Sequence, residues 1–317
     1  MKKIGIVGAG KWGMNLVRTF RDLGELAAVA EMNEELRLQL KALYPELTVY
    51  DSVQPLLQSE VEGVVIATPV QTHYQIARET LLAGKDVFVE KPITLSVDEA
   101  SELDQLAQAK QRILMVGHLL LYQPAVQWIK QYVQEGNLGE LYSLHQYRKQ
   151  LGRIRTVENV LWSLGVHDIA VLLAIIGTTP ERIMASGHAM LQPQIEDEVH
   201  LHLRFPKGIQ AHLHMSWLWP VRERRTILIG SAGMLEYDEQ KQTVIKHRKY
   251  VDGALTIQDE GSELVFRGDQ EPLTREALHF LECMANRTPP QSDGKNGMAV
   301  IRVLSEATRL LQKGGEV

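Results

Sequence analysis

A chain of 317 residues with 44% hydrophobic and 23% charged residues is long enough for two globular domains of ordinary size. Its formal net charge of −5 excludes a general electrostatic attraction to nucleic acid. Its single cysteine, Cys283, excludes an intrachain disulfide bond and fits a reducing compartment.

The first third of the chain alternates short apolar runs, rich in β-branched residues, with amphipathic segments. We expect strands at residues 3–7, 26–31, 48–50, 63–67, 86–90 and 113–117, and helices at 11–23, 34–43, 53–58, 72–83 and 97–110. Strands that alternate with helices predict a parallel sheet with helices on both faces. Several of the strands are apolar throughout, which is typical of strands covered on both faces. The prediction for residues 1–118 is therefore an α/β Rossmann domain.

The pattern changes after Gly117. We expect helices at 124–134 and 166–176 on either side of a strand at 141–148, and then longer strands at 182–188, 199–205, 209–217, 226–229, 234–237 and 243–247. The short connections at 205–209 and 231–234 are typical of hairpins. Two helices follow at 274–286 and 297–312. For residues 119–317 this predicts an α+β domain with a mostly antiparallel open sheet.

A glycine-rich loop, Gly8-x-Gly10-x-x-Gly13, follows the first predicted strand and opens the first predicted helix. In this context the first glycine permits a tight turn, the second lets a pyrophosphate approach the backbone, and the third lets the helix pack on the strand. The helix N-terminus supplies amide donors for the phosphates. The three glycines, with Lys11 and Trp12 between them, are therefore predicted to bind a dinucleotide.

The second predicted strand indicates which dinucleotide binds. It ends in Glu31, 18 residues after Gly13, close to the offset of about 20 expected for an acidic residue that binds the adenosine ribose. A carboxylate there accepts hydrogen bonds from the ribose and repels a 2′-phosphate, so NAD is predicted rather than NADP. Arg37, which could meet a 2′-phosphate, lies a full turn into the next helix.

Further candidate residues lie at the ends of the fourth and fifth predicted strands. Thr68, Pro69 and His73 follow the fourth strand, and the fifth ends in Glu90 and is followed by Lys91. Ligands bind at the carboxyl ends of the strands in open α/β sheets, so these residues are predicted to line the cofactor site on its nicotinamide side. A lysine there can hold a substrate hydroxyl, and apolar walls or other cations lower its pKa toward the range needed for proton transfer. The alternative is a solvated surface lysine.

Four motifs together carry a family resemblance. The glycine loop, Ala67-Thr68-Pro69 with His73, Glu90-Lys91-Pro92 and Gly165-x-His167-Asp168 resemble the glucose–fructose oxidoreductase/inositol dehydrogenase family over essentially the whole chain. The resemblance implies that Lys91 contacts both the substrate and the nicotinamide ribose. It also implies that His167 is the acid/base at the hydroxyl being oxidised. Asp168, its neighbour in the sequence, is a candidate to orient the imidazole.

Ser163 departs from the family pattern, which has an aspartate four residues before the histidine. The usual Lys–Asp–His trio is thereby reduced to Lys91 and His167, which counts against a free polyol or inositol as the substrate. A narrower resemblance is to enzymes that oxidise the 3-hydroxyl of UDP-N-acetylglucosamine or its uronic acid. It is carried by segments 117–124, 159–163, 216–220 and 271–273, with His279 and Phe280. This narrower resemblance implies a nucleotide-sugar substrate, bound by residues that include Tyr122, Trp162 and Asp168.

Basic residues lie at the end of the strand expected at 141–148 and directly after it: Arg148, Lys149, Arg153 and Arg155. Guanidinium groups match the geometry of phosphate, so Arg148, Arg153 and Arg155 are predicted to contact the diphosphate of such a substrate. The alternative is a solvated basic loop.

Four histidines alternate along two neighbouring predicted strands: His200, His202, His212 and His214. A three-residue loop between the strands would place His202 opposite His212 and His200 opposite His214, whereas another loop length would put the pairs on different faces. No carboxylate or cysteine framework that would complete a metal site is evident, and hydride transfer to NAD needs no metal. We therefore expect no metal, and a subunit interface or a solvated sheet face instead.

Two other features are assigned to packing. Cys283 lies in an apolar helical pattern, which predicts a buried structural thiol. Trp217 and Trp219 are expected to share one strand face, in an oligomer interface or along the substrate cleft.

These observations predict an NAD-dependent sugar dehydrogenase. We expect it to be cytoplasmic, with no membrane span and no nucleic-acid partner, and to form a homodimer or homotetramer through the C-terminal sheet. Two alternatives remain open. One is a dehydrogenase for a free sugar or inositol, and the other is a non-catalytic NAD-sensing regulator built on the same fold.

Overall fold

The computed structural model describes residues 3–268 and 271–313, which fall into two compact units. The first unit contains the residues up to Leu119 together with Glu271–Ile301, and the second contains the rest of the described chain. A single division at residue 118 therefore differs from the structure at the C-terminal end. There α8 (Pro272–Asn286) packs on α1 (Gly13–Asp22), and the Val116 amide donates a hydrogen bond to the Ser292 carbonyl. Such contacts between distant segments leave no local sequence pattern.

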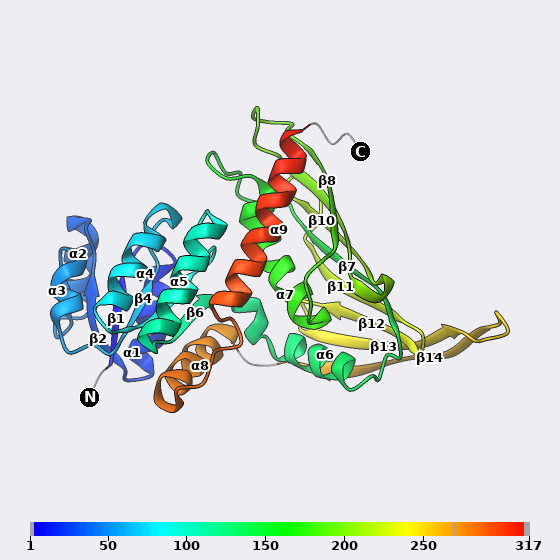
Figure 1. Ribbon diagram of the computed structural model, residues 1–317, viewed down its shortest axis with the longest axis horizontal. Helices are drawn as coiled ribbons and strands as arrows, with labels where there is room; N and C mark the ends of the chain where they lie inside the picture. The colour runs from blue at the N-terminus through cyan, green and yellow to red at the C-terminus, as the bar shows by residue number, and fades with distance from the viewer. Residues whose placement is uncertain (1–2, 269–270, 314–317) are drawn as a thin grey trace. The chain divides into compact units, whose positions relative to one another are not determined.

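A parallel sheet forms the first unit, and its described strands run in the order β3-β2-β1-β4-β5-β6 (Figure 1). The strands are β1 (Ile4–Val7), β2 (Leu26–Ala30), β3 (Thr48–Tyr50), β4 (Gly63–Ile66), β5 (Asp86–Glu90) and β6 (Leu114–Gly117). Besides α1 and α8, its helices are α2 (Glu34–Leu43), α3 (Val53–Gln58), α4 (His73–Leu82) and α5 (Val97–Lys110). The strand order reverses between β1 and β4, where doubly wound sheets bind dinucleotides. The α/β prediction is confirmed.

Two glycines show that helices cover both faces of this sheet. A Cβ at Gly5 would lie 2.8 Å from the Leu56 side chain of α3, and a Cβ at Gly63 would lie 2.8 Å from the Met284 side chain of α8. Gly63 pairs with Ile4 across the two strands, and successive residues of a strand point to opposite faces. The helices α3 and α8 therefore cover opposite faces, and each approaches closely at a position without a side chain.

The second unit is built on a sheet whose described strands run in the order β14-β13-β12-β11-β7-β10-β9-β8. Its strands are β7 (Leu141–Lys149), β8 (Arg182–His188), β9 (Glu198–Arg204), β10 (Gln210–Ser216), β11 (Glu223–Gly230), β12 (Gly233–Asp238), β13 (Thr243–Val251) and β14 (Ile257–Arg267). Neighbours are antiparallel except β7 and β10, which are parallel. The prediction of a mostly antiparallel sheet and of both hairpins is confirmed.

The two faces of this second sheet differ in polarity. One face, the covered face, carries buried apolar residues such as Leu144, Leu201 and Leu213. The helices α6 (Pro124–Gln134) and α7 (Val166–Ile176) pack together within this unit, and α7 contacts β7. The other face, the open face, carries these alternate residues: Ser143, His145, Tyr147 and Lys149 on β7, Glu198, His200 and His202 on β9, and His212 and His214 on β10. The predicted association of copies through this sheet stays a prediction.

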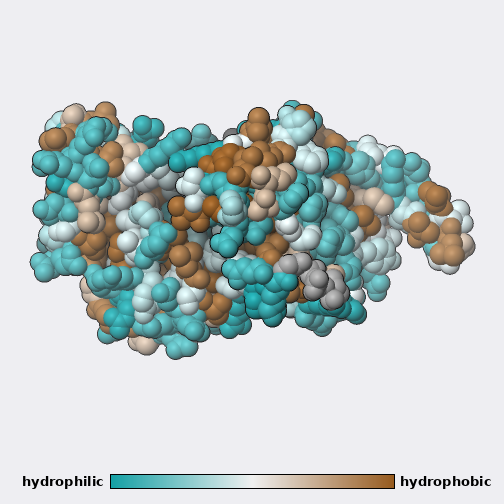
Figure 2. All heavy atoms as spheres, turned by 90° about the horizontal axis from the view of Figure 1, so that it is seen from above, coloured by the Kyte–Doolittle hydropathy of each residue, from teal (hydrophilic) through white to brown (hydrophobic). Residues whose placement is uncertain are grey.

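A hairpin formed by β13 and β14 extends the sheet beyond the strands that the sequence predicts. No strand is expected after residue 247, yet β14 pairs with β13. Figure 2 shows hydrophobic residues at the hairpin tip, at the far right of the view, where Val251, Leu255 and Ile257 are 57%, 85% and 79% exposed. None of the helices in the described ranges is long and apolar enough to span a membrane.

Candidate active site

The glycine loop of the first unit has the geometry that its sequence predicts. Gly8 has a φ of 92°, which favours glycine, and a Cβ there would lie 3.0 Å from the Ala67 carbonyl group. A Cβ at Gly13 would lie 2.1 Å from the Gly8 carbonyl oxygen, whereas a Cβ at Gly10 would meet nothing within 4 Å. The first and third glycines are thus required by the turn and by packing. The second faces open space, as a backbone that receives a pyrophosphate should.

A cavity of about 290 Å³ lies beside this loop. Of the residues predicted to bind the cofactor, Gly8, Gly10, Glu31, Thr68 and Pro69 line it. The sequence analysis misses the rest of the lining: Val7, Ala30, Met32, Leu36, Ser52, Val53, Ala67, Thr72 and Ile76. Position after a strand end is the signal that could have identified Met32 and Ser52, which follow β2 and β3. The largely apolar lining suits the flat face of an adenine ring.

Glu31 is held in place by the backbone around it. Its carboxylate accepts hydrogen bonds from the Ala9 amide at 2.6 Å and the Asn33 amide at 2.8 Å. The Arg37 guanidinium donates to the carbonyl oxygens of Glu31 and Met32, at 3.0 and 2.7 Å. Arg37 therefore reaches the end of β2 despite its position in α2, but it is occupied by these two carbonyls. The glycine cradle and the oriented carboxylate together fit a dinucleotide with an unmodified adenosine ribose.

His73 links the loops that follow β4 and β5. Its Nε2 lies 2.8 Å from the Thr68 carbonyl oxygen and its Nδ1 lies 2.9 Å from the Pro92 carbonyl oxygen. The ring is 2% exposed, and burial lowers its pKa against the two carbonyl oxygens, which favour the protonated ring. This burial corrects the expectation of a direct cofactor contact, because the ring holds the two loops together instead.

Glu90 is the last residue of β5 and Lys91 follows it, as predicted. The buried Glu90 carboxyl group accepts hydrogen bonds from the Trp12 indole N–H at 2.6 Å and from the Lys91 amide at 3.3 Å. Burial raises the pKa of Glu90 to about 7, against the opposing effects of Trp12 and Lys91. Trp12 thus connects the glycine loop to the end of β5. The Lys91 side chain is half-buried at that strand end.

Two further buried ionisable groups accompany Glu90 and are missing from the predicted site. Glu276 of α8 is fully buried, and neither carboxyl oxygen has a hydrogen-bond partner among the described residues. Burial and the charge of Glu90 raise the pKa of Glu276 well above its usual range. His118, directly after β6, is also buried, and burial with the nearby Lys91 charge lowers its pKa to about 3. Glu276 lies 186 positions after Glu90, so no local pattern indicates that they meet.

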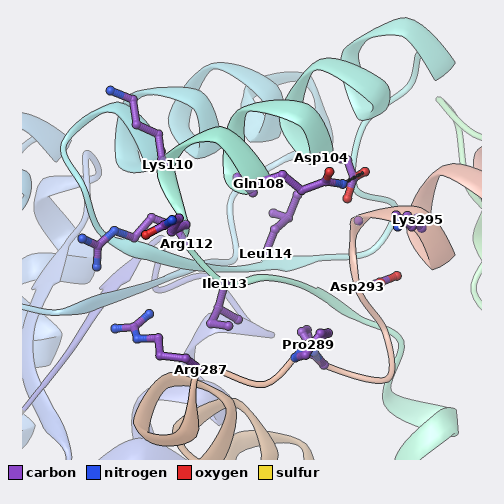
Figure 3. A pocket seen from close by; sticks show the side chains of 14 residues that line it. Asp104, Gln108, Lys110, Arg112, Ile113, Leu114, Arg287, Pro289, Asp293 and Lys295 are labelled. Carbon is purple, nitrogen blue, oxygen red and sulfur yellow. Dashed lines mark hydrogen bonds between the residues drawn. The ribbon is translucent and has the colours of Figure 1, made fainter.

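A larger cavity of about 660 Å³ in the same unit is unsuited to the cofactor (Figure 3). It lies where β6 begins, at Ile113 and Leu114, whereas ligands of open α/β sheets bind at the carboxyl ends of the strands. Arg287, one of its cations, is tied to both carboxylate oxygens of the buried Asp86 at 2.8 Å. The smaller cavity beside the glycine loop is therefore the candidate cofactor site.

In the second unit His167 is the second residue of α7 and is half-buried. A single turn of π-helix, Leu161–Gly165, precedes α7, and such turns are frequent at functional sites. Ser163, at the position of the family's aspartate, is buried within that turn. Asp168 does not orient His167 as expected, because its carboxylate accepts a hydrogen bond from Arg148 Nε at 2.8 Å.

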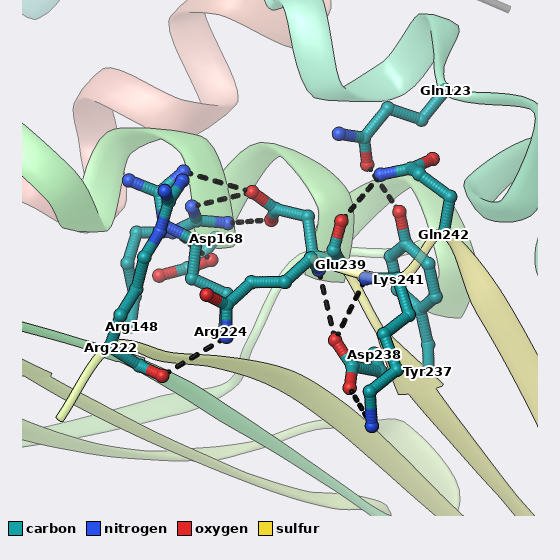
Figure 4. Close-up of polar contacts among 11 residues, drawn as sticks. Gln123, Arg148, Asp168, Arg222, Arg224, Tyr237, Asp238, Glu239, Lys241 and Gln242 are labelled. Carbon is teal, nitrogen blue, oxygen red and sulfur yellow. Dashed lines mark hydrogen bonds and ion pairs between the residues drawn. The ribbon is translucent and has the colours of Figure 1, made fainter. Parts of the chain in front are cut away.

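Arg148 belongs to a buried cluster of charges on the covered face rather than to a basic loop (Figure 4). The strand β7 continues through Lys149, so Arg148 points to the covered face and Lys149 to the open face. The two terminal nitrogens of Arg148 donate to Glu239 at 3.2 and 2.6 Å, and Arg224 donates to the same carboxylate at 3.1 Å. These partners engage all three nitrogens of the buried Arg148 guanidinium, which corrects its expected contact with a substrate diphosphate.

The remaining predicted substrate residues have mixed surroundings. Trp162 donates its indole N–H to the Thr308 hydroxyl at 2.9 Å, which indicates a packing role. Tyr122 is buried in the short helix Leu119–Tyr122. In the loop after β7, Arg155 lies 3.5 Å from Glu158, while Arg153 is exposed and has no ion pair in the part of the chain that the structure describes.

Two packing predictions have different outcomes. Cys283 is buried, as expected. Trp217 and Trp219 do not share a face, because β10 ends at Ser216. The buried Trp217 indole donates to Asp197, whereas the Trp219 ring meets the Lys149 ammonium and the edge of His214 on the open face.

Comparison with known proteins supports both units. A family model described as an oxidoreductase family with an NAD-binding Rossmann fold matches residues 2–118, and the model of the GFO/IDH/MocA C-terminal domain matches residues 126–236. These matches confirm the predicted cofactor, NAD, and the predicted family resemblance.

Similar proteins of comparable length are known. UDP-N-acetylglucosamine 3-dehydrogenase of Acidithiobacillus ferrooxidans is 28% identical over 303 residues, which cover 94% of each chain. A solved structure of that enzyme superimposes with a TM-score of 0.88 over 99% of both chains, at 25% identity. The 2,7-anhydro-N-acetylneuraminate hydratase of Escherichia coli is 25% identical over 76% of this chain and 68% of its own. A protein from gentamicin A biosynthesis, solved with NAD, shares the fold with a TM-score of 0.83 over 99% of this chain and 95% of its own, at 21% identity.

Proposed function

Because this chain belongs to the GFO/IDH/MocA family of NAD-dependent oxidoreductases, we propose that it oxidises the 3-hydroxyl of UDP-N-acetylglucosamine, or of its uronic acid, to a 3-keto sugar. One observation carries the substrate assignment: the full-length similarity to the Acidithiobacillus enzyme that bears this activity in its name. Ser163, in place of the family's aspartate, argues against a free polyol or inositol as the substrate.

Lys91 and His167 are the proposed catalytic residues. NAD, when bound, accepts the hydride from the carbon that carries the reacting hydroxyl. The Lys91 ammonium holds the hydroxyl oxygen, and the His167 imidazole takes its proton as the C–H bond breaks. General-base help of this kind accelerates a reaction about 10²–10⁴-fold. Glu31 orients the adenosine ribose, and the amides of the glycine loop receive the pyrophosphate.

Recognition of the nucleotide diphosphate is assigned to Arg153 and Arg155. Arg148 is excluded because Asp168 and Glu239 occupy it. Arg153 has the most accessible guanidinium of the three, and the 3.5 Å contact of Arg155 with Glu158 is a half-exposed ion pair of small energetic value. Replacing both arginines by alanine should raise the KM for a UDP-sugar and leave the Kd for NAD unchanged.

The test is a turnover assay with NAD and a panel of nucleotide sugars, followed by absorbance at the NADH band. We expect turnover with UDP-N-acetylglucosamine or its uronic acid. Lys91→Ala and His167→Ala should each lower kcat by about 10²-fold or more. Lys110→Ala, a lysine of the same unit at the end of α5, is the matched control and should keep the wild-type rate. Normal turnover in both catalytic variants would refute the assignment.

Two alternatives predict different outcomes. A dehydrogenase for a free sugar or inositol would turn over those compounds, and UDP would not raise its melting temperature. A non-catalytic NAD-sensing regulator would bind NAD and turn over no sugar. Thermal stabilisation by UDP follows from ligand linkage if the native protein binds it, so a melting curve with and without UDP separates the substrate classes before any assay.

A further inference from the structure

The histidines of the open face lie in two rows that cross the strands. His202 pairs with His212 and His200 with His214, as a three-residue loop predicts. Glu198 precedes His200 by two residues, so the two side chains point to the same face of β9. The expectation that no carboxylate accompanies these histidines is therefore wrong. Glu198 lies on the same strand as His200 and on the same face.

Three donor atoms converge at Glu198. The Nε2 atom of His200 lies 3.1 Å from Glu198 Oε1, and the Nε2 atom of His214 lies 2.7 Å from the same oxygen. All three donor atoms lie within 4.8 Å of one another. Around a tetrahedral zinc ion, with bonds of about 2.0–2.1 Å, ligand atoms are about 3.3 Å apart. The two distances to Glu198 Oε1, 3.1 and 2.7 Å, lie below that spacing, so the imidazoles need to move outward by less than about 1 Å for an ion to enter between the donors.

The surroundings hold the two imidazoles in place. The rings of His200 and His214 stack with centroids 4.0 Å apart, and the Trp219 ring meets His214 edge-on at 5.4 Å. The side chains of His214, Glu198 and His200 are 15%, 25% and 42% exposed, respectively. The group is therefore partly buried but accessible to an ion from solvent. The neighbouring Lys149 ammonium is paired with the Glu223 carboxylate at 3.0 Å and lies over the Trp219 ring. Its charge is thus largely neutralised.

We propose that Glu198, His200 and His214 form a binding site for a divalent transition-metal ion of the zinc class. Two imidazoles and one carboxylate are ligands that such ions accept, and a fourth position remains for water or an outside donor. The ion would clip β9 to β10 on the open face. Hydride transfer to NAD requires no metal, so the site is separate from the redox reaction.

The second row shows why a single ion per chain is expected. His202 and His212 approach with their Nδ1 atoms 2.7 Å apart, and His145 stacks on His212 with centroids 4.8 Å apart. In the described ranges, no carboxylate joins these three imidazoles as Glu198 joins the other two. Without an anionic ligand this row is the weaker site.

The test uses the full chain without a histidine tag, stripped with a chelator and titrated with Zn²⁺ by calorimetry at neutral pH. We expect one ion per chain. The double variant His200→Ala/His214→Ala should weaken binding by more than about 100-fold. His247→Ala is the matched control, since His247 also pairs with a carboxylate, Glu236 at 3.3 Å, but as a single imidazole. Its affinity should equal that of the wild type. Wild-type protein without stoichiometric binding, or a double variant that binds as tightly as wild type, overturns the proposal.

A measurement on the wild-type protein guards against a variant that fails to fold. Co²⁺ added in place of Zn²⁺ should give the intense visible absorption of a four-coordinate ion, displaced by one equivalent of Zn²⁺. The weak spectrum of the six-coordinate aqueous ion would overturn the proposal. Neither measurement depends on the sugar substrate, so a failure of the proposed function leaves this test intact.

Discussion

Both units bury carboxyl groups, but the second unit places guanidinium groups beside them. In the first unit Glu90 has an indole N–H and one amide as partners, and Glu276 has none among the described residues. In the second unit Glu239 accepts hydrogen bonds from both Arg148 and Arg224. Burial raises the pKa in each case, but the Arg148 charge outweighs it at Glu239, whose pKa falls below its usual range.

The difference shows how each unit accommodates a buried carboxyl group. At Glu90 the Lys91 charge and the Trp12 hydrogen bond do not offset burial, so the pKa rises, whereas the two arginines beside Glu239 keep that carboxylate ionised. The cluster of the first unit therefore titrates near neutral pH, with Glu90 at about 7. It also touches the glycine loop through Trp12. In the cluster of the second unit Glu239 keeps its charge, whereas burial raises the pKa of Asp168 above its usual value despite the nearby Arg148. We expect the pH response near neutral pH to come from Glu90 of the first cluster.

Removing a cation from the second cluster is the largest expected perturbation. Arg148→Met leaves the buried Asp168 without its partner and Glu239 with Arg224 alone. Breaking a buried ion pair on one side costs about 3–5 kcal/mol of unfolding free energy. Urea denaturation measures the loss, and Arg204→Met, the same change at an exposed position of β9, should cost little. A loss below about 1 kcal/mol would mean that water reaches the cluster.

Neutralising Glu90 tests the first cluster. The folded-state pKa of Glu90, about 7, lies above its unfolded value, so its protonation stabilises the fold fully at acidic pH and this contribution is lost as the pH rises through about 7. Glu90→Gln removes that loss and keeps an acceptor for the Trp12 indole. The variant should gain about 1–3 kcal/mol over wild type above pH 8 and little at pH 5. Urea denaturation across pH checks this, with the exposed Glu60→Gln as control. An unchanged pH profile would assign the titration to another group.

The smallest effect is expected at Trp12. Trp12→Phe keeps an aromatic ring, although a smaller one, and removes the N–H that donates to Glu90. That hydrogen bond favours the ionised carboxylate, so the variant should raise the pKa of Glu90 further. The cost in unfolding free energy is about 1 kcal/mol and should be larger at alkaline pH than at acidic pH. Comparison of the variant's pH profile with that of Glu90→Gln shows whether the two side chains act together.

Local sequence patterns predict much of this molecule. Apolar runs and amphipathic periods locate the strands of the first sheet, since each element buries a face that its own sequence records. The Gly8 loop and Glu31 are recognisable because turn geometry and cofactor contact depend on neighbouring residues. Arg148 is misassigned because its position beside other basic residues suggests a loop, whereas its partners, Asp168 and Glu239, come from separate elements.

Contacts between segments that are far apart in the chain could not be predicted from the sequence. Glu276 reaches Glu90 only because α8 returns to the first unit, and β14 forms because β13 is there to pair with it. The contacts of Glu198 with His200 and His214 lie within two neighbouring strands. They could be predicted from the sequence only with the correct register of β9 against β10.

The two amide donors of Glu31 bear on how tightly and how fast the cofactor binds. A carboxylate offers about four lone-pair positions, and the Ala9 and Asn33 amides fill two of them. The other two can receive the ribose 2′- and 3′-hydroxyls without breaking any bond already made. The rotational freedom of this side chain is lost when the chain folds and not when the ligand arrives, so association should be nearly free of reorganisation at this end of the dinucleotide.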